Sequence, residues 1–309
     1  MANYRTSCPD LNFLPEGKYE SAFFLLLWGG FSLPVGAQDL PISQIIIDGE
    51  GWELLSEGHQ FTEGPAVNNQ GEVFFTDVPT SEIFKITLDG KVTLFSDQAN
   101  QTAGLIFGAD GKLYGTSIGG KAIVQFDDAG KPAAIAEGVN CNDLVVLADG
   151  NVFFTDHVDG KIWNISPDGK LKEVAAGIAF PNGIIAWPDQ KQLVVSDMKG
   201  ASLWNFVIAS DGSLKHQQPY STMQLPVGLS ESGADGMTVD RMGRLYVCTT
   251  LGVQVFDTQG RLSGILSKPQ RAFLSNVTFG GPELDYLYAT TKDKVYRRKL
   301  KTTGVRFTR

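Results

Sequence analysis

The chain has 309 residues, of which 42% are hydrophobic and 19% charged, with 35 Gly and 14 Pro. This composition excludes a disordered chain, a coiled coil and a collagen-like protein. The 34 Asp and Glu residues outnumber the 26 Lys and Arg residues, which gives a net charge of −8 at pH 7. An acidic surface disfavours nucleic acid and anionic membranes as partners.

Residues 21–37 form an uncharged segment near the start of the chain, with the apolar run Ala22–Trp28 and small residues up to Ala37. This pattern predicts a secretory signal cleaved after Ala37, and therefore export to the periplasm or the extracellular space. An uncleaved membrane anchor is the alternative, but a spanning helix needs about 20 apolar residues. Of the cysteines downstream, Cys141 and Cys248 could pair in an oxidising compartment if they lie close together.

A sequence repeat of about 40 residues organises the rest of the chain, residues 38–309, which we expect to form one domain. A phrase of the type Gly-Asn-Val-Phe-Phe-Thr-Asp has its first apolar residue at 73, 113, 152, 193, 245 and 287. A second phrase of the type Ile162-Trp-Asn-Ile165 follows each copy with nearly the same steps. One step of 52 residues contains an insertion near Ser210–Gly233. This insertion could form an apolar lid over the substrate or an extended hairpin of the fourth blade, and the sequence leaves both alternatives open.

Each repeat has the pattern of short strands. Apolar and polar residues alternate, and Asp-Gly pairs supply the positive φ that tight hairpins need. We count four strands in each of six repeats, which predicts an all-β fold, a six-bladed β-propeller with four-stranded blades. The segment Trp52–Ser56 precedes the first full repeat, and we expect it to pair into the last blade and close the ring.

The strand that opens each repeat carries a recurring polar position. It falls at Glu63, Ala103, Asn142, Asn182, Asp235 and Asn276. Equivalent residues of innermost strands should face the central channel, and five of these six offer a side-chain oxygen. Asp and Asn are also ordinary turn formers, but five converging polar side chains are costly to bury unless something satisfies them. Calcium binds six to eight such oxygens, so we expect one divalent ion here, most plausibly Ca²⁺.

Six stretches of the sequence resemble one known family. They are Phe61-Thr-Glu-Gly-Pro65, Asn142-Asp-Leu144, Phe154-Thr-Asp156, Phe180-Pro-Asn-Gly183, Asp235-Gly-Met237 and Asn276-Val-Thr-Phe-Gly-Gly281. In this order they are similar to the gluconolactonase/regucalcin (senescence-marker protein) family of six-bladed propellers, and to its bacterial gluconolactonases in particular. The resemblance implies a metal-dependent hydrolase that opens a sugar lactone or another small lactone.

The resemblance also implies roles for single residues. Glu63, Asn142, Asn182 and Asp235 would bind the metal, and Asp235 would also be the catalytic carboxylate that takes a proton from the attacking water. The substrate side of the pocket is expected at these four positions: Asn276, His157, Ala103 and Ser117. Many bacterial relatives carry Asn where Ala103 stands and Cys-Glu-His where Thr116-Ser-Ile118 stands, so the substrate need not be gluconolactone.

Two other functions remain open at this stage. Diisopropyl fluorophosphatase shares the architecture, so the same ion could serve a phosphotriesterase. A non-catalytic propeller that binds a ligand, with calcium as a purely structural ion, is the other alternative. The sequence does not decide the oligomeric state.

Overall fold

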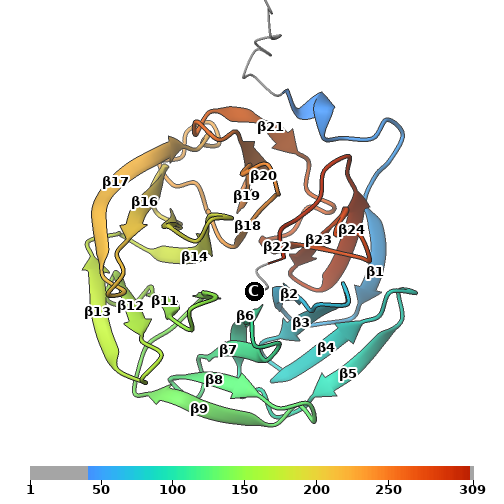
Figure 1. The fold of residues 1–309 in the computed structure, drawn as a ribbon. Coiled ribbons are helices and arrows are strands. Elements are labelled where there is room, and N and C mark those ends of the chain that lie inside the picture. The colour runs from blue at the N-terminus through green and yellow to red at the C-terminus, as the bar shows by residue number, and fades with distance from the viewer. Residues whose placement is uncertain (1–40, 307–309) are drawn as a thin grey trace, which may run out of the picture. The chain divides into compact units, whose positions relative to one another are not determined.

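The computed structural model describes residues 41–306, and the predicted signal segment lies outside them. Within this range the chain forms 24 strands and one short 3₁₀ helix, η1 (Ile42–Gln44). The strands form six antiparallel four-stranded sheets, arranged around a central axis (Figure 1). The predicted all-β, six-bladed propeller is therefore confirmed. No helix among residues 41–306 is long and apolar enough to cross a membrane.

The first three blades follow one another along the chain, each running from an innermost to an outermost strand. Blade 1 consists of β2 (Thr62–Val67), β3 (Val73–Asp77), β4 (Glu82–Ile86) and β5 (Val92–Ser96). Blade 2 consists of β6 (Thr102–Phe107), β7 (Leu113–Ser117), β8 (Ala122–Phe126) and β9 (Pro132–Glu137). Blade 3 consists of β10 (Leu144–Val146), β11 (Val152–Asp156), β12 (Lys161–Ile165) and β13 (Leu171–Ala176).

The last three blades keep this order, except that the final blade borrows its outermost strand. Blade 4 consists of β14 (Pro181–Ala186), β15 (Gln192–Asp197), β16 (Ser202–Ile208) and β17 (Leu214–Thr222). Blade 5 consists of β18 (Met237–Val239), β19 (Leu245–Thr249), β20 (Gly252–Phe256) and β21 (Leu262–Leu266). Blade 6 consists of β22 (Leu274–Gly280), β23 (Tyr286–Thr291), β24 (Lys294–Lys299) and β1 (Glu53–Glu57).

Burial falls from the axis outward. All residues of β3, β11 and β19 are buried, whereas β13 is exposed or half-buried along its length. The second strand of a blade packs against the neighbouring blades on both faces, which explains its continuous apolar run. Fully buried aromatic side chains such as Phe75, Phe153 and Phe256 fill these inter-blade layers. Removing them from water is the main stabilising contribution to the ring.

The ring closes where the predicted segment pairs with the end of the chain. Strand β1 pairs antiparallel with β24, with Glu53 opposite Arg297. The guanidinium of Arg297 donates to both carboxylate oxygens of Glu53, at 2.7 and 3.1 Å. This confirms the expectation for residues 52–56, since pairing removes the free sheet edges that an open ring would expose.

A C-terminal segment continues from β24 beneath blades 6 and 5. Gly304 pairs with Asp240, and the Thr302 hydroxyl donates to the Asp240 carboxylate at 2.9 Å. The same carboxylate accepts from Arg244 at 2.8 Å and from Tyr246 at 3.1 Å. Asp240 is fully buried, so this cluster fastens the segment to blade 5.

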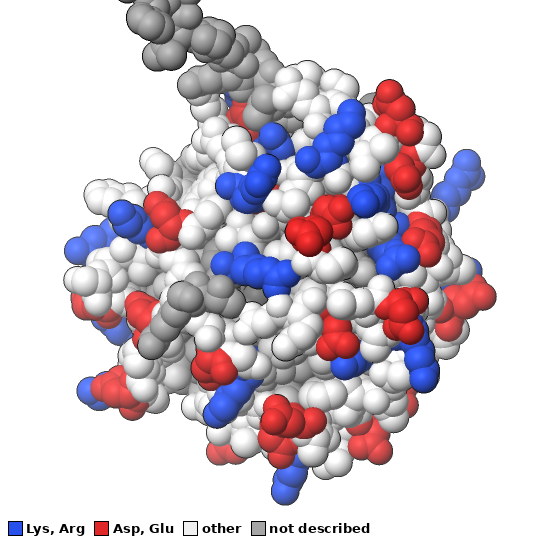
Figure 2. Space-filling model, turned by 45° about the vertical axis from the view of Figure 1, so that its right-hand side comes forward, with Lys and Arg blue, Asp and Glu red and all other residues white. Residues whose placement is uncertain are grey.

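Charged side chains of both signs are interspersed over the face drawn in Figure 2. At the periphery of the ring, ion pairs join neighbouring strands, such as Lys161 with Glu173 at 3.0 Å and Lys294 with Glu57 at 2.8 Å. Exposed pairs of this kind add little to stability, because water and salt screen them. The propeller is therefore held by its inter-blade layers, and its charged periphery adds little.

Candidate active site at the propeller axis

Bulges in the innermost strands shape the axis. The register between β2 and β3 shifts between Glu63 and Ala66, and similar shifts interrupt β6, β14 and β22 at their first residues. A bulge places two residues opposite one on the partner strand and turns a side chain to a new direction. The recurring polar positions of the sequence lie at these bulges or, in blades 3 and 5, just before the innermost strand.

Hydroxyl groups of the second strands hold these positions from the neighbouring blade. Thr116 donates to the Asn142 carbonyl and Thr155 to the Asn182 carbonyl, both at 2.6 Å. Ser196 donates to the Asp235 carbonyl at 2.9 Å. These three innermost residues are thus fixed by the blade before each of them, so the geometry of the axis depends on the packing of adjacent blades.

The same bonding pattern corrects one residue of the sequence prediction. The Gly104 N–H donates to the Asn142 carbonyl, and the Gly236 N–H donates to the Ser275 carbonyl in the same way. Ser275, not Asn276, is therefore the blade 6 counterpart of Asn142. The periodicity was off by one residue here because spacing alone does not reveal where a bulge accommodates its extra residue. The upper layer of the axis, in blade order, is Glu63, Ala103, Asn142, Asn182, Asp235 and Ser275.

A second layer, the floor, lies one residue further along each blade. Its members are Gly64, Gly104, Asp143, Gly183, Gly236 and Asn276. A Cβ added to Gly236 would overlap the Asn276 amide, and one added to Gly104 would lie 2.5 Å from Asp143 Oδ1. Glycine is therefore required where the two large side chains cross the axis. Asn276 Nδ2 lies 3.4 Å from Asp143 Oδ2, which joins blades 6 and 3 from opposite sides of the ring.

Backbone N–H groups fix the orientation of these polar side chains. Gly64 N donates to Glu63 Oε2 at 2.8 Å, and Val277 N donates to Asn276 Oδ1 at 2.9 Å. The Asn276 Nδ2 group therefore faces the carboxylates, 3.4 Å from Glu63 Oε2 as well as from Asp143. Asn276 separates two negative charges and connects the floor to the upper layer.

Three buried carboxyl groups share the axis. Glu63 and Asp143 are 8% exposed and Asp235 is 5% exposed. Burial and the Asp143 charge raise the pKa of Glu63 to about 8, and burial raises the pKa of Asp143 to about 7. Burial, then the charges of Glu63 and Asp143, raise the pKa of Asp235 well above its ordinary value. Since each carboxylate disfavours ionisation of another, a cation placed among them would relieve a large electrostatic cost.

The donor set fits a hard divalent cation. The Oδ1 atom of Asn182 is buried and has no hydrogen-bond partner in the described part of the chain, as expected for an oxygen that serves a ligand. No group of three or more His, Cys, Asp or Glu side chains among residues 41–306 forms a metal cluster by itself. An ion at this axis would therefore need the amide oxygens as well as the carboxylates, which is calcium chemistry more than zinc chemistry.

Two of the predicted substrate residues, His157 and Ser117, differ in whether their side chains are free to bind a ligand. His157 follows β11 at the same end of the axis, and its ring centroid lies 4.9 Å from that of Phe180. Its Nδ1 is buried and lacks a partner within the described residues, and burial lowers the pKa of the ring. Ser117, in contrast, donates its hydroxyl to the Asn100 carbonyl at 2.9 Å and accepts from Gly120 N at 3.2 Å.

Sequence reasoning missed Asp143. It lies in the quoted stretch Asn142-Asp-Leu144, but the periodic position was assigned to Asn142 alone. The available signal was an acidic residue at a position that is Gly in four of the six blades. Asp143 N–H is held by Thr155 Oγ1 at 3.1 Å, and Asp143 Oδ1 accepts from Leu144 N at 2.9 Å.

The two downstream cysteines are free and buried. Cys248 occupies the blade 5 counterpart of Thr155 and Ser196, and its N–H donates to the Gly236 carbonyl at 3.0 Å. Burial, and then the charges of Asp235 and Glu63, raise the pKa of its thiol well above the ordinary value. A neutral, enclosed thiol of this kind behaves as a small apolar side chain rather than as a nucleophile.

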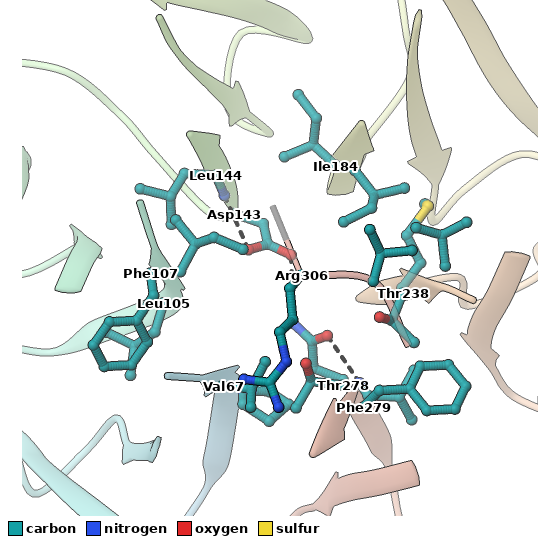
Figure 3. A pocket seen from close by; sticks show the side chains of 18 of the residues that line it. Val67, Leu105, Phe107, Asp143, Leu144, Ile184, Thr238, Thr278, Phe279 and Arg306 are labelled. Atoms are coloured by element: carbon teal, nitrogen blue, oxygen red, sulfur yellow. Dashed lines mark hydrogen bonds between the residues drawn. The ribbon is translucent and has the colours of Figure 1, made fainter. Parts of the chain in front are cut away.

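A cavity of about 80 Å³ lies below the floor. Figure 3 looks into it: apolar side chains including Leu105, Ile184 and Phe279 form its walls, and Arg306 lies in the middle of the view. Arg306 belongs to the C-terminal segment and donates to the Pro282 carbonyl at 3.0 Å and to the Asn69 carbonyl. The upper layer is thus approached from the other end of the axis, where the innermost strands begin.

Known proteins share this architecture and sequence pattern. A gluconolactonase from Zymomonas mobilis is 27% identical over 293 residues, covering 82% of each chain. The structure of a Xanthomonas campestris gluconolactonase aligns with a TM-score of 0.72 at 26% identity, covering 81% of this chain and 90% of that one. A calcium-binding regucalcin from Agrobacterium tumefaciens shares the fold, with a TM-score of 0.70 at 18% identity over 82% of this chain and 95% of that one.

A family model covers most of the propeller. It is described as the SMP-30/gluconolactonase/LRE-like region and matches residues 61–293. This range starts just before Glu63 and includes every member of the upper layer and the floor. The chain therefore belongs to the SMP-30/gluconolactonase/LRE-like family.

Proposed function

We propose that this protein is a metal-dependent lactonase that opens a small lactone by hydrolysis at the propeller axis. The observation that carries the proposal is the ring of buried carboxylate and amide side chains, with the unpartnered oxygen of Asn182 among them. Family membership and relatives named gluconolactonase support the reaction class. We assign the metal ligands to Glu63, Asn142, Asn182 and Asp235.

Calcium is the ion we propose. The donor set is made of hard oxygens from two carboxylates and two amides, which together neutralise a divalent charge. The regucalcin that shares this fold is itself named as a calcium-binding protein. A divalent ion bound here would polarise the lactone carbonyl and lower the pKa of a water molecule beside it.

The side chains of the axis supply the proton transfers. Asp235 accepts a proton from the attacking water while the water oxygen bonds to the carbonyl carbon. The ring C–O bond then breaks, and Asp235 returns the proton to the leaving alkoxide, so that a hydroxy acid is released. His157 is proposed to contact the substrate, whereas Asn276, predicted from the sequence for the substrate side, is proposed to support the ligand ring from the floor.

We also propose that the protein acts outside the cytoplasm, on the basis of the uncharged segment at residues 21–37. Cell fractionation of the full chain, followed by mass determination of the mature N-terminus, checks this. Cleavage after Ala37 is expected. Recovery of the intact chain in the cytoplasm would contradict the proposal without affecting the chemistry at the axis.

The test of activity is lactone hydrolysis by the chain from Gln38, corrected for spontaneous ring opening. The panel contains glucono-1,5-lactone, simple five- and six-membered lactones, and diisopropyl fluorophosphate as the phosphotriester alternative. Calcium is added to one series and a chelator to another, and metal binding is measured separately by calorimetry. Calcium-dependent turnover of a lactone is the expected result. A metal-loaded protein that hydrolyses none of the lactones contradicts the proposal.

A further inference from the structure

The entrance to the upper layer is framed by two sets of loops. Thr62 pairs with Asp77, Thr102 with Ser117, and Leu274 with Thr291. The start of each innermost strand therefore lies level with the end of the second strand. The loops after the second strands, and those leading into the innermost strands, meet at this end. A backbone bond joins them in several blades, as from Ile118 N to the Gln101 carbonyl and from Lys292 N to the Phe273 carbonyl.

These loops carry exposed apolar side chains, which we call the apolar rim. Its members, with their exposed fractions, are Ile118 (37%), Val158 (62%), Val227 (104%), Leu229 (56%) and Phe273 (39%). They come from four loops at this end of the axis, two within blades 2 and 3 and two between successive blades. The turns at the opposite end of the axis contribute Leu88 and Met242 to the exposed large hydrophobic residues. Exposed apolar side chains at the end of the axis that holds the ligand ring point to an apolar ligand.

Aromatic side chains continue this surface toward the axis. Phe273 packs against Phe61, with ring centroids 5.9 Å apart, and Phe61 immediately precedes β2. On another side Phe180 lies beside His157 and beneath the Lys199 ammonium group, 5.2 Å from its ring centroid. Phe61 and Phe180 are each two residues from a proposed metal ligand, Glu63 and Asn182. Aromatic side chains thus lie between members of the rim and the strands that carry two of the proposed ligands.

The loop of residues 223–233 is the insertion that the sequence analysis identified. Its ends are anchored, because Met223 N donates to the Ala201 carbonyl at 2.7 Å and Gly233 N to the Met198 carbonyl at 3.1 Å. Between these anchors it turns at Pro226 and presents Val227 and Leu229 to solvent. Two such side chains at the tip of a loop anchored at both ends are available to pack against an apolar ligand.

Three of the four positions predicted for the substrate side leave few free polar groups for a polyhydroxylated substrate. Ala103 has no polar side-chain atom, and both bonds of the Ser117 hydroxyl are made to backbone groups. Asn276 is bonded to Val277 N and to the two carboxylates. A sugar lactone would lose hydrogen bonds to water at each hydroxyl without replacement, at about 1–3 kcal/mol for each unsatisfied group.

We propose that the substrate is a lactone bearing an apolar alkyl or aryl substituent, with the ring at the upper layer and the substituent against the apolar rim. This inference rests on the proposed lactonase function and adds the class of substrate. The substituent buries the rim side chains on binding, and the ring needs few hydrogen bonds beyond those of the metal ligands and His157. Leu229 and Phe273, in the loops that precede and follow blade 5, determine specificity.

A homologous series of γ-lactones tests the proposal, since its members differ only in the length of one alkyl chain. With about 0.8 kcal/mol for each fully buried methylene, kcat/KM should rise by up to about 4-fold per carbon. We expect a rise of about 2- to 4-fold per carbon from γ-valerolactone to γ-nonalactone, and a lower kcat/KM for glucono-1,5-lactone than for γ-nonalactone. A flat series with faster turnover of gluconolactone overturns the proposal.

Two rim variants locate the effect. Leu229→Ser and Phe273→Ser should each lower kcat/KM for γ-nonalactone by about 5- to 10-fold and leave γ-valerolactone within 2-fold. Leu88→Ser is the matched control, because Leu88 is 47% exposed in the β4–β5 turn at the opposite end. It should leave the whole series unchanged. Equal losses for short and long lactones in the rim variants would show a structural effect and overturn the assignment.

The remaining outcomes distinguish a failure of the apolar substrate class from a failure of the lactonase function on which it rests. If no lactone is hydrolysed although calcium binds, the lactonase function itself fails. If lactones are hydrolysed at rates that do not depend on the length of the alkyl chain, the lactonase function is supported and the apolar substrate class is refuted. Sedimentation and vesicle flotation are measured on the same variants. A loss of self-association or of vesicle binding, with an unchanged γ-lactone series, assigns the rim to another copy or to lipid and overturns the proposal.

Discussion

Asp235 shows most directly what the buried charges of the axis do. Its pKa is raised by burial and then by the charges of Glu63 and Asp143. Without a cation the three carboxylates oppose one another, so the folded state favours their protonated forms. With a cation the same oxygens become its ligands. The same side chains therefore lower the stability of the metal-free protein and provide its affinity for the cation.

The substitution Asp235→Asn separates these two effects. We expect turnover to fall at least 100-fold, because the proton acceptor is lost, and calcium affinity to fall with it. The metal-free variant should melt at a higher temperature than metal-free wild type at pH 8, since one of three mutually repelling charges is gone. Lactone assays and thermal melts measure this. Asp128→Asn, at an exposed turn, is the control and should change neither quantity. Wild-type rates in the Asp235 variant would refute its catalytic role.

Gly236 illustrates how little space the floor allows. A methyl group there would overlap the side-chain amide of Asn276, which spans the axis to Asp143. We expect Gly236→Ala to lower the free energy of unfolding by about 1–3 kcal/mol through overpacking, and to lower kcat/KM by more than 10-fold. Denaturant titration and kinetics check this.

The control for that substitution is Gly51→Ala, whose added methyl group would meet no atom within 4 Å. It should be neutral in both measurements. If Gly236→Ala is neutral as well, Asn276 does not form a closely fitted floor.

The sequence predicted most of this layer arrangement but not all of it. Glu63, Asn142, Asn182 and Asp235 were identified because they recur at about 40-residue steps, apart from the one long step. Ser275 was missed because a bulge in β22 changes which of two adjacent residues belongs to the upper layer. Asp143 was missed because it lies at the floor position, one residue beyond the recurring position, where most blades have Gly. His157 was named from its position, but its buried, unpartnered Nδ1 is visible only in the structure.

At the scale of secondary structure, the C-terminal segment depends on one buried cluster. Asp240 accepts hydrogen bonds from Arg244, Tyr246 and Thr302, and from the Met242 and Arg244 N–H groups. The cluster joins the β18–β19 turn to residues that follow β24. It thereby holds Arg306 at the cavity below the floor.

Removing this carboxylate tests the cluster. We expect Asp240→Ala to reduce the free energy of unfolding by about 3–5 kcal/mol, because the buried Arg244 charge loses its partner. Lys170→Ala removes an exposed ion pair with Asp168 and should leave the free energy of unfolding nearly unchanged. Urea titration of both variants measures the difference. A loss for Asp240→Ala as small as that for the control would mean that water replaces the carboxylate.

The insertion shows the limits of element prediction. The sequence located it at residues 210–233 from a single long repeat step, but left a lid and an extended hairpin open. The structure shows an extended outer strand, since β17 runs for nine residues before the loop of 223–233 leads to Asp235, and the role of this loop as a lid stays a prediction. Strand counts followed from periodicity, whereas the path of an aperiodic loop depends on contacts such as that of Met223 N with Ala201.

At the scale of the whole molecule, the proposed ligands come from blades 1, 3, 4 and 5, so an ion ties the ring together. We expect removal of calcium to lower Tm by about 5–10 °C for an ion initially present at 100 times its Kd, which corresponds to about 2.7 kcal/mol. Scanning calorimetry with and without chelator measures this. An unchanged Tm would mean that the ion bridges nothing that folding requires.

The stability of the metal-free protein should also depend on pH, and it should fall as the pH rises. The pKa values of Glu63 and Asp143 rise from 4.5 to about 8 and from 3.8 to about 7 on folding. The folded state therefore holds more protons than the unfolded state between about pH 4 and pH 8, and stability falls as pH rises through this window. Urea titrations of the metal-free protein at pH 5 and pH 8 measure this, and the free energy of unfolding should be lower at pH 8. Glu63→Gln should flatten the dependence, and an equal slope in that variant would contradict this origin.

The pairing of β1 with β24 sets the order in which the molecule can be completed. Lys294 bonds Glu57 across 237 residues of chain, so the first strand leaves the ribosome long before its partner exists. Until then the nascent protein is an open ring with unpaired N–H and C=O groups along β1, and any β24 of a neighbouring chain is a competing partner. Closure within one chain is favoured by dilution, and exchange of β1 between two chains by crowding during synthesis.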